Sequence, residues 1–214
     1  YRGHNLFWPN NSPSWFQSYM DLETRKEFIL NYITKVLDYY KDEENILYWD
    51  VINESVEDDS TSDSIKLRTG KNNEFLGWDT YTEDIFTIAR EHTKPNVKLF
   101  YNDYNAENNN GNIDGKTGAV YNYIKAMIDK NVPIDGVGLQ MHISCNYYPN
   151  YSQLYELITK YQDIGVEVHV TEIDVSMENC ETHEDQRKIY SDVFKACFDH
   201  VNCKVFTVWG AYDS

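Results

Sequence analysis

Six short apolar segments, separated by stretches of helical periodicity, constrain the fold of this chain more than any other feature. Each segment is rich in β-branched and aromatic residues and is too short for a buried helix, so each predicts a buried β-strand. The predicted strands end at Trp8, Glu54, Asp103, His142, Asp174 and Trp209. Strands that alternate with helices predict an α/β fold with a parallel sheet and right-handed crossovers.

Apolar residues recur at helical spacing between these strands. The predicted helices cover residues 18–40, 79–92, 116–131, 151–163 and 184–199. Asp79 or Thr80 is the expected N-cap of the second helix, because both side chains can accept a hydrogen bond from a free backbone N–H. No internal repeat or low-complexity linker interrupts the alternation, so we expect a single domain over residues 1–214.

Polar or aromatic side chains lie at the carboxyl end of every predicted strand. The run ILYWDVINES at residues 46–55 places Asn53 and Glu54 there, and the run EVHVTEIDV at 167–175 places Glu172. Because parallel strands bring their carboxyl ends to one rim, these side chains should surround a shared cleft, as in a (β/α)8 barrel. We expect Glu54 and Glu172 to face one another across a sugar-binding cleft.

The composition limits the partners that such a cleft can serve. The chain carries 19 Lys and Arg against 35 Asp and Glu, for a formal net charge of −16, which disfavours binding to nucleic acids and to anionic membranes. No apolar run approaches the roughly 20 residues of a membrane-spanning helix. Aromatic residues make up 15% of the chain; such rings stack on sugars, although a large aromatic core explains the share equally well.

The strand ends resemble those of the family 10 glycoside hydrolases, the endo-β-1,4-xylanases. The matching segments follow the family's order along the whole chain: RGHNLFW at 2–8, SPSWF at 12–16, WDVINE at 49–54, YNDYN at 101–105, GVGLQMHI at 136–143, VTEIDV at 170–175 and TVWG at 207–210. The combination of WDVINE with TEIDV is the most specific of these matches. The resemblance implies a (β/α)8 TIM barrel, of which this chain would supply about strands 3 to 8.

By the same pattern, Trp8 closes the third strand of the barrel and Trp209 closes the eighth. The first two strands and the last helix would then be absent, and six strands cannot close an eight-stranded barrel. We therefore expect residues 1–214 to form a partial catalytic domain that is attached to further parts of the same protein.

The resemblance implies a secreted, retaining endo-1,4-β-xylanase that cleaves internal linkages of xylan and xylo-oligosaccharides without a cofactor. Double displacement through a covalent glycosyl-enzyme would use Glu54 as the general acid/base and Glu172 as the nucleophile, with their carboxyl groups about 5–5.5 Å apart. Two alternatives stay open: a non-catalytic xylan-binding relative that keeps the cleft, and a β-glucanase on the same barrel.

Further positions match residues that support these roles in the family. His142 and Asp174 would hold Glu172, and Asn53 would bond the 2-hydroxyl of the sugar. Substrate contacts are implied for His4, Trp8, Tyr104, Asn105, Gln140 and Trp209. Each aromatic residue among them has an ordinary core role as its alternative, and a metal site is a less favoured interpretation of the Glu, His and Asp cluster.

One position departs from the family, where a histidine commonly follows the tryptophan of the third strand. Here the residue is Pro9, which lacks a backbone N–H and fixes φ. We expect a reshaped loop there, with effects on affinity for the sugar of the glycone side or on the pH optimum.

The four cysteines bear on the cellular compartment. Cys197 and Cys203, which precede TVWG, resemble a disulfide of many fungal members. For Cys145 and Cys180 the sequence leaves two alternatives open: a second disulfide, or two reduced thiols. No pair has the CxxC spacing of a zinc site, so no metal is predicted. Oxidised cysteines would place the protein outside the cytosol.

Overall fold

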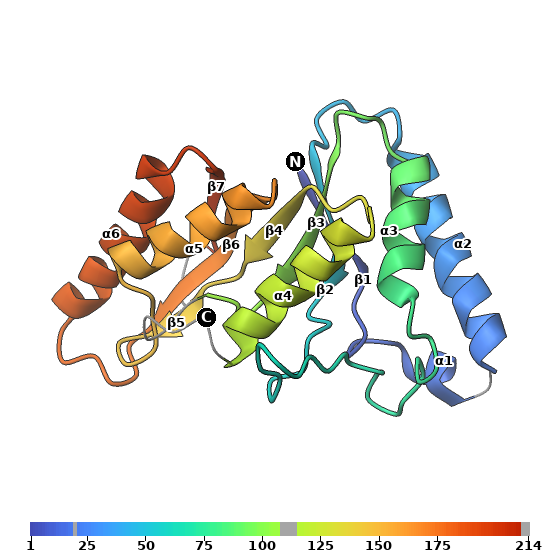
Figure 1. The fold of residues 1–214 in the computed structure, drawn as a ribbon, viewed down its shortest axis with the longest axis horizontal. Helices are drawn as coiled ribbons and strands as arrows, with labels where there is room; N and C mark the ends of the chain where they lie inside the picture. The colour runs from blue at the N-terminus through green and yellow to red at the C-terminus, as the bar shows by residue number, and fades with distance from the viewer. Residues whose placement is uncertain (19–20, 108–114, 211–214) are drawn as a thin grey trace.

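The computed structural model describes residues 1–18, 21–107 and 115–210 of the chain (Figure 1). The strands are β1 (Arg2–Phe7), β2 (Tyr48–Asn53), β3 (Lys98–Asp103), β4 (Gly136–Leu139), β5 (His142–Ser144), β6 (Glu167–Ser176) and β7 (Cys203–Val208). The helices are α1 (Ser14–Ser18), α2 (Leu22–Tyr40), α3 (Tyr81–Glu91), α4 (Gly115–Asp129), α5 (Tyr151–Asp163) and α6 (His183–Asp199). The predicted alternation of strands and helices is confirmed.

The strands form one parallel sheet in the order β1-β2-β3-β4-β6-β5, with β7 paired to β6. In the part of the chain that the structure describes, β1 pairs only with β2, and β5 and β7 each pair only with β6, so the sheet is open rather than closed into a barrel. Helices α2, α3, α5 and α6 each pack against strands that precede or follow them in the sequence. The fold is thus a portion of a (β/α)8 barrel, as the sequence predicted. That residues 1–214 make up a single domain stays a prediction.

Two predicted elements were wrong in detail. The helix expected over 18–40 begins instead at Leu22, because Asp21 is extended and its Oδ1 accepts from the backbone N of Thr24 at 2.8 Å; residues 19–20 of that prediction lie outside the described residues. The strand expected over 135–143 is two strands, β4 and β5, separated at Met141, whose φ is 63°. For α3, Thr80 rather than Asp79 is the N-cap residue.

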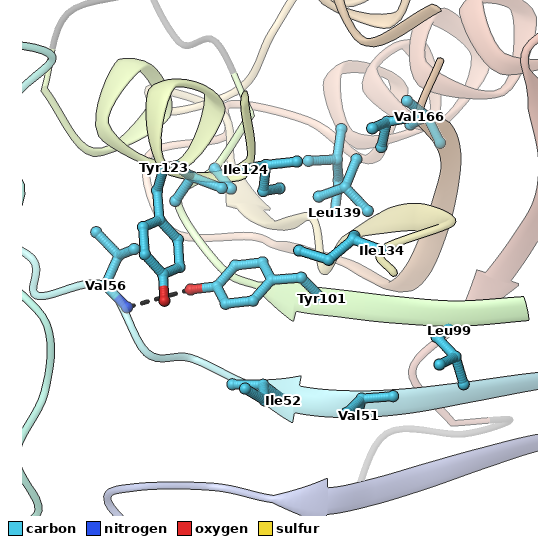
Figure 2. Close-up of a cluster of buried hydrophobic side chains, with 14 of the residues drawn as sticks. Val51, Ile52, Val56, Leu99, Tyr101, Tyr123, Ile124, Ile134, Leu139 and Val166 are labelled. Carbon is cyan, nitrogen blue, oxygen red and sulfur yellow. Dashed lines mark hydrogen bonds between the residues drawn. The ribbon is translucent and has the colours of Figure 1, made fainter. Parts of the chain in front are cut away.

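Alternate residues of the strands face opposite sides of the sheet, and the two sides differ. Val51, Leu99 and Val137 are fully buried in an apolar cluster with residues of the helices, part of which Figure 2 shows. Asp50, next to Val51, and Asn102, three positions after Leu99, are buried polar residues of the other side. The apolar side holds the helices in place, and the polar side supplies functional groups.

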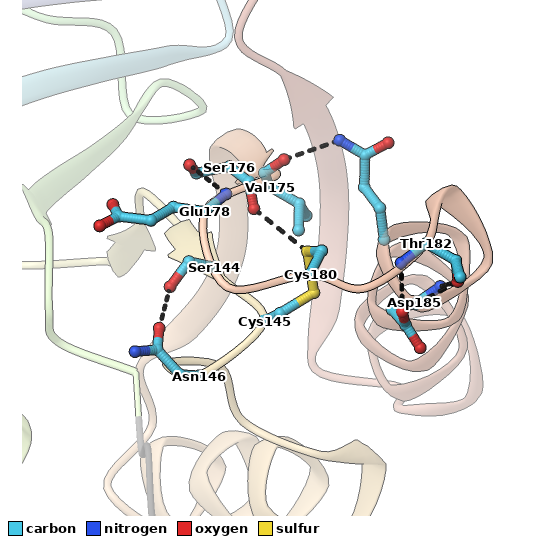
Figure 3. The surroundings of a disulfide bond; sticks show 10 residues. Ser144, Cys145, Asn146, Val175, Ser176, Glu178, Cys180, Thr182 and Asp185 are labelled. Carbon is cyan, nitrogen blue, oxygen red and sulfur yellow. Dashed lines mark hydrogen bonds between the residues drawn. A yellow bond between two sulfur atoms is a disulfide. The ribbon is translucent and has the colours of Figure 1, made fainter.

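Two disulfides join elements around β5, β6 and β7. Cys145 after β5 is bonded to Cys180 before α6 (Figure 3). Cys197 in α6 is bonded to Cys203, the first residue of β7. The Cys197–Cys203 bridge is the one that the resemblance implied. The Cys145–Cys180 bridge shows that these two cysteines, which the sequence left either bridged or reduced, are bridged.

Among the described residues, no helix combines the length and the apolar character that crossing a membrane requires.

Candidate active site

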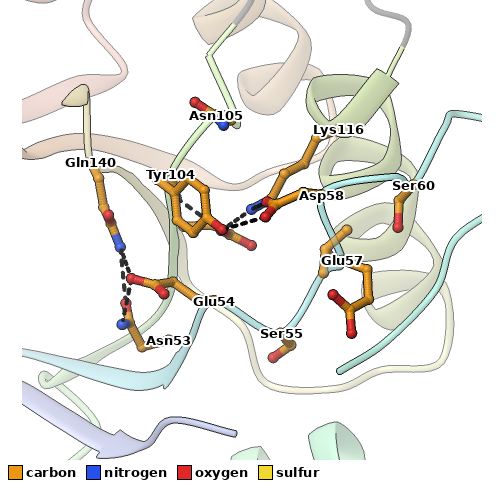
Figure 4. Close-up of polar contacts among 12 residues, drawn as sticks. Asn53, Glu54, Ser55, Glu57, Asp58, Ser60, Tyr104, Asn105, Lys116 and Gln140 are labelled. Carbon is orange, nitrogen blue, oxygen red and sulfur yellow. Dashed lines mark hydrogen bonds and ion pairs between the residues drawn. The ribbon is translucent and has the colours of Figure 1, made fainter. Parts of the chain in front are cut away.

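Glu54 lies at the carboxyl end of β2, where its backbone adopts a φ of 55°, a left-handed conformation that side chains other than glycine seldom adopt. Its Oε1 accepts hydrogen bonds from Asn53 Nδ2 at 3.1 Å and Gln140 Nε2 at 2.9 Å, and its Oε2 accepts from Trp8 Nε1 at 3.0 Å. Figure 4 shows the amides of Asn53 and Gln140 directed at this carboxylate. Side chains at the carboxyl ends of β1, β2 and β4 therefore fix the orientation of the Glu54 carboxylate.

Glu172 lies in β6 and is 7% exposed. Its Oε1 accepts from Asn102 Nδ2 at 2.8 Å, and its Oε2 lies 3.3 Å from His142 Nε2. Burial opposes ionisation, but the hydrogen bonds from His142 and Asn102 outweigh it, so the pKa of Glu172 is lowered from its ordinary value. This carboxylate is thus held ionised.

His142 connects Glu172 to a second acid. Its Nδ1 lies 3.0 Å from Asp174 Oδ2, a contact that follows from the pairing of His142 with Asp174 between β5 and β6. Burial would lower the pKa of His142, but the contacts with Glu172 and Asp174 outweigh it and raise that pKa. An imidazole whose protonated form is favoured by two carboxylates in turn favours the charged form of Glu172.

Asn102, which was not predicted as a site residue from the sequence, links the two glutamates. Its Nδ2 donates both to Glu172 and, at 2.9 Å, to Asn53 Oδ1, while the amide of Asn53 donates to Glu54. Two side-chain amides therefore connect the carboxylates. The register of the strands could have indicated this, since Asn53 pairs directly with Asn102.

The neighbours of Asn102 set its orientation. Thr171 Oγ1 donates to Asn102 Oδ1 at 2.7 Å, which turns the Nδ2 group toward the carboxylates. Gly138 on the adjacent strand leaves room for the amide, because a Cβ there would lie 2.1 Å from Asn102 Oδ1. Any side chain at position 138 would displace the link between the two glutamates.

His4 borders the cleft beside Glu172 and is held by Asp50, a second residue that was not predicted from the sequence. His4 Nδ1 lies 3.0 Å from Asp50 Oδ2, and this hydrogen bond raises the pKa of His4 above its usual value. Arg2 pairs with the same carboxylate at 3.0 Å. Asp50 is 1% exposed, so this pairing compensates a buried charge.

Tyr104 lies near Glu54 on the same rim, and its side chain is held in place by several contacts. Its hydroxyl donates to Asp58 Oδ2 at 2.7 Å and accepts from Arg68 Nη2 at 2.9 Å, while Lys116 Nζ lies 3.5 Å from the ring centroid. Figure 4 shows Asn105 on the same rim, apart from Glu54; its backbone carbonyl accepts from Thr117 Oγ1. Of the predicted substrate contacts, Gln140 and Tyr104 are thus tied into the site, and Asn105 is placed beside it.

Trp8 directly follows β1, and Trp209 directly follows β7. Together with His4 they line an open hollow of about 620 Å³. Trp209 is 58% exposed, and its ring lies 5.6 Å from the His142 ring in an edge-on arrangement. Pro9 occupies the second position of a turn closed by the hydrogen bond from Asn11 N to Trp8 O, where its fixed φ is readily accommodated.

Over residues 1–18, 21–107 and 115–210, no three His, Cys, Asp or Glu side chains are arranged so as to hold a metal ion. The site brings together two carboxylates, their hydrogen-bond donors and an aromatic rim. A pair of glutamates of which one is kept ionised is the arrangement used to cleave glycosidic bonds.

Comparison with known proteins agrees with that chemistry. The family model of glycosyl hydrolase family 10 matches residues 1–214. The chain belongs to glycosyl hydrolase family 10. Endo-1,4-beta-xylanase B of Neocallimastix patriciarum is 39% identical over 216 residues, which are 100% of this chain and 24% of that protein. Endo-1,4-beta-xylanase A of Thermoanaerobacterium saccharolyticum is 37% identical over 99% of this chain and 18% of its own length.

Solved structures of family 10 xylanases have the same fold. Xylanase 10B of Thermotoga maritima superposes with a TM-score of 0.82 at 29% identity, covering 98% of this chain and 62% of that one. A Bispora sp. MEY-1 xylanase with bound xylobiose gives a TM-score of 0.83 at 28% identity, with the same coverage. This chain therefore spans 62% of each of these two solved chains and about a quarter or less of the curated relatives named above.

Proposed function

We propose that the protein containing these residues is a retaining endo-1,4-β-xylanase. The observation that carries the proposal is the arrangement of Glu54 and Glu172 on neighbouring parts of one rim, joined through the amides of Asn53 and Asn102. Retaining hydrolysis needs two carboxyl groups with unequal tasks, and the two environments differ in the required sense.

Glu172 is suited to attack the anomeric carbon. His142 and Asn102 hold its carboxylate ionised and oriented, and an ionised, positioned carboxylate can form the covalent glycosyl-enzyme. The bond from the anomeric carbon to the leaving oxygen breaks as the bond to a Glu172 oxygen forms. The charge lost from Glu172 in this step also weakens its attraction for the His142 proton.

Glu54 is suited to move the proton. It donates to the leaving oxygen in the first step, and in the second step it accepts a proton from the water that releases the sugar. Asn53 and Gln140 donate to Glu54 Oε1 and Trp8 donates to Oε2. These three donors hold the carboxyl group on the side of the cleft where Tyr104 provides a fixed aromatic surface for the departing sugar.

Xylan is proposed as the substrate because related structures carry its oligosaccharides. Besides the xylobiose complex, a glutamate-to-alanine mutant of the T. saccharolyticum xylanase was solved with xylotriose, at 32% identity, a TM-score of 0.81 and 65% coverage of that chain. A glucan is the second candidate, since exoglucanase XynX of Acetivibrio thermocellus is 36% identical over 99% of this chain. Glucose units carry a C6 hydroxymethyl group that xylose lacks.

The test is reducing-sugar release by the full-length protein from xylan, carboxymethyl cellulose and mixed-linkage β-glucan. The proposal predicts activity on xylan that Glu172→Ala abolishes and that a control variant, Glu44→Ala at an exposed position, retains. Activity on the glucans alone would favour the second candidate, and xylan binding without turnover would indicate a non-catalytic relative.

We also propose that the protein is secreted and that this chain is one part of a longer polypeptide. Two disulfides support an oxidising compartment. Family membership does not decide the location, because the T. saccharolyticum relative is described as an intracellular xylanase. The 24% coverage of the Neocallimastix protein supports the longer polypeptide. Secretion is tested by assaying culture medium and cell lysate of the source for the protein.

A further inference from the structure

The backbone that follows Glu54 is held by a phenol group from the neighbouring strand. Tyr101 in β3 is fully buried, and its hydroxyl oxygen accepts hydrogen bonds from the backbone N of Ser55 and of Val56, each at 3.1 Å. Figure 2 shows this phenol reaching the chain at Val56. Two consecutive amides of the turn that carries Glu54 thus bind one side-chain atom.

A buried carboxylate fixes the phenol in turn. Tyr101 donates its proton to Asp103 Oδ2 at 2.5 Å, and Asp103 is fully buried. The other oxygen, Oδ1, accepts from Tyr104 N and from Lys116 Nζ, both at 2.9 Å. One carboxylate therefore anchors both the Glu54 turn and the backbone of the rim residue Tyr104.

This arrangement explains how Glu54 keeps an unfavourable conformation. A left-handed φ at a residue with a side chain persists only when the surroundings enforce it. The backbone N of Glu54 donates to Asn102 O at 2.9 Å, and the carbonyl of Ser55 accepts from Arg68 N at 2.7 Å. Tyr101 supplies the remaining contacts for the two amides that follow, and no other described residue bonds them.

We infer that Tyr101 is a positioning residue for Glu54, which acts by fixing the turn after it and is itself held by Asp103. The inference rests on the proposed function. Proton transfer needs the acid within hydrogen-bond reach of the leaving oxygen, and small misplacements of a reacting group cost large factors in rate. Loosening the turn should thus impair proton transfer while leaving attack by Glu172 intact.

The test compares Tyr101→Phe with wild type in the full-length protein on two aryl β-xylobiosides. Phenol is a poor leaving group that needs protonation, whereas dinitrophenol leaves without it. We expect kcat/KM for the phenyl xylobioside to fall by about 10- to 100-fold, within the range that general acid catalysis supplies. We expect kcat/KM for the dinitrophenyl xylobioside to stay within about twofold of wild type, because the first step with this substrate needs no acid.

Tyr123→Phe is the matched control. Tyr123 is a buried tyrosine whose ring lies 6.0 Å from that of Tyr101, and its hydroxyl bonds Thr82 rather than the Glu54 turn. This variant also removes a buried phenol hydrogen bond, so it should lower stability without distinguishing the two substrates. An equal loss on both substrates in Tyr101→Phe, or the same selectivity in Tyr123→Phe, would overturn the inference.

If Tyr101→Phe does not fold, Asp103→Asn takes its place, since it weakens the acceptor of the phenol proton while keeping the shape of the side chain. It must then show the same selective loss on the phenyl substrate, in smaller measure, and a loss that is equal on both substrates would contradict the inference.

A wild-type protein that cleaves neither xylobioside would refute the proposed function and this inference together. An active wild type with an unselective variant would refute the inference alone.

Discussion

At the scale of single residues, the site separates two chemically identical side chains by their hydrogen-bond partners. Glu172 faces the imidazole of His142, whereas Glu54 receives only neutral donors from Asn53, Gln140 and Trp8. The contacts with His142 and Asn102 lower the pKa of Glu172. The two carboxylates therefore differ in what they contact, which supports the separate roles proposed for them.

Asn102→Ala tests the link between the glutamates. Removing a donor from Glu172 takes away one of the contacts that lower its pKa, so the acidic limb of the kcat/KM profile should move to higher pH. By analogy with the loss of one preorganised donor, kcat/KM should fall by about 10²- to 10³-fold. The measurement is a pH–rate profile on an aryl xylobioside. Asn122→Ala removes an amide that bonds Ser62 O outside the cleft, and it should leave the profile in place.

Glu54→Ala tests the proton donor. We expect the variant to lose most activity on xylan and on substrates with poor leaving groups, and to retain the first step on activated aryl glycosides, where no proton is needed. Steady-state kcat/KM across a series of aryl xylobiosides measures this dependence. A uniform loss across the series would contradict the assignment of Glu54 as the acid.

At the scale of elements, the two disulfides constrain loops of different length. Cys145 and Cys180 are 35 positions apart, whereas Cys197 and Cys203 are 6 apart. The chain-entropy model gives about 4 kcal/mol of stabilisation for the longer loop and about 2 kcal/mol for the shorter. Replacing each pair by serines and measuring unfolding in denaturant should therefore give the larger loss for Cys145 and Cys180. The reverse order would show that native contacts, rather than loop entropy, dominate.

The elements also show what could be predicted from the sequence. Strands ending near Glu54 and Asp103 were predictable because apolar runs of that length have few other structures. The interruption between β4 and β5 was not, since it depends on the left-handed Met141. Asn102 was missed for a related reason. The contacts of a polar residue inside a buried strand depend on the strand register, which a single sequence does not reveal.

At the scale of the whole molecule, two fully buried acids link stability to pH. Burial raises the pKa of Asp103 to about 6 and that of Glu107 to about 7. In the unfolded chain both would ionise near 4, so between about pH 4 and 7 the folded state binds more protons. These groups therefore make the free energy of unfolding decrease as pH rises through that range.

Glu107→Gln isolates this effect, because neither carboxylate oxygen of Glu107 has a hydrogen-bond partner among the described residues. The variant should gain stability relative to wild type on going from pH 5 to pH 8, by on the order of 3 kcal/mol at most. Urea unfolding of both proteins at the two pH values measures the change. A difference between variant and wild type that is independent of pH would show that Glu107 is not a buried, protonated acid.

The central claim is that Glu172 forms a covalent bond to the sugar while Glu54 moves the proton. The most direct measurement is mass spectrometry of the full-length protein after incubation with a 2-fluoro xylobioside that carries a good leaving group, followed by proteolysis. The fluorine slows release of the sugar more than its transfer, so the glycosyl-enzyme should accumulate. We expect a fluoroxylobiosyl label on the peptide that contains Glu172. A label on any other residue, or none in a protein that cleaves xylan, would contradict it.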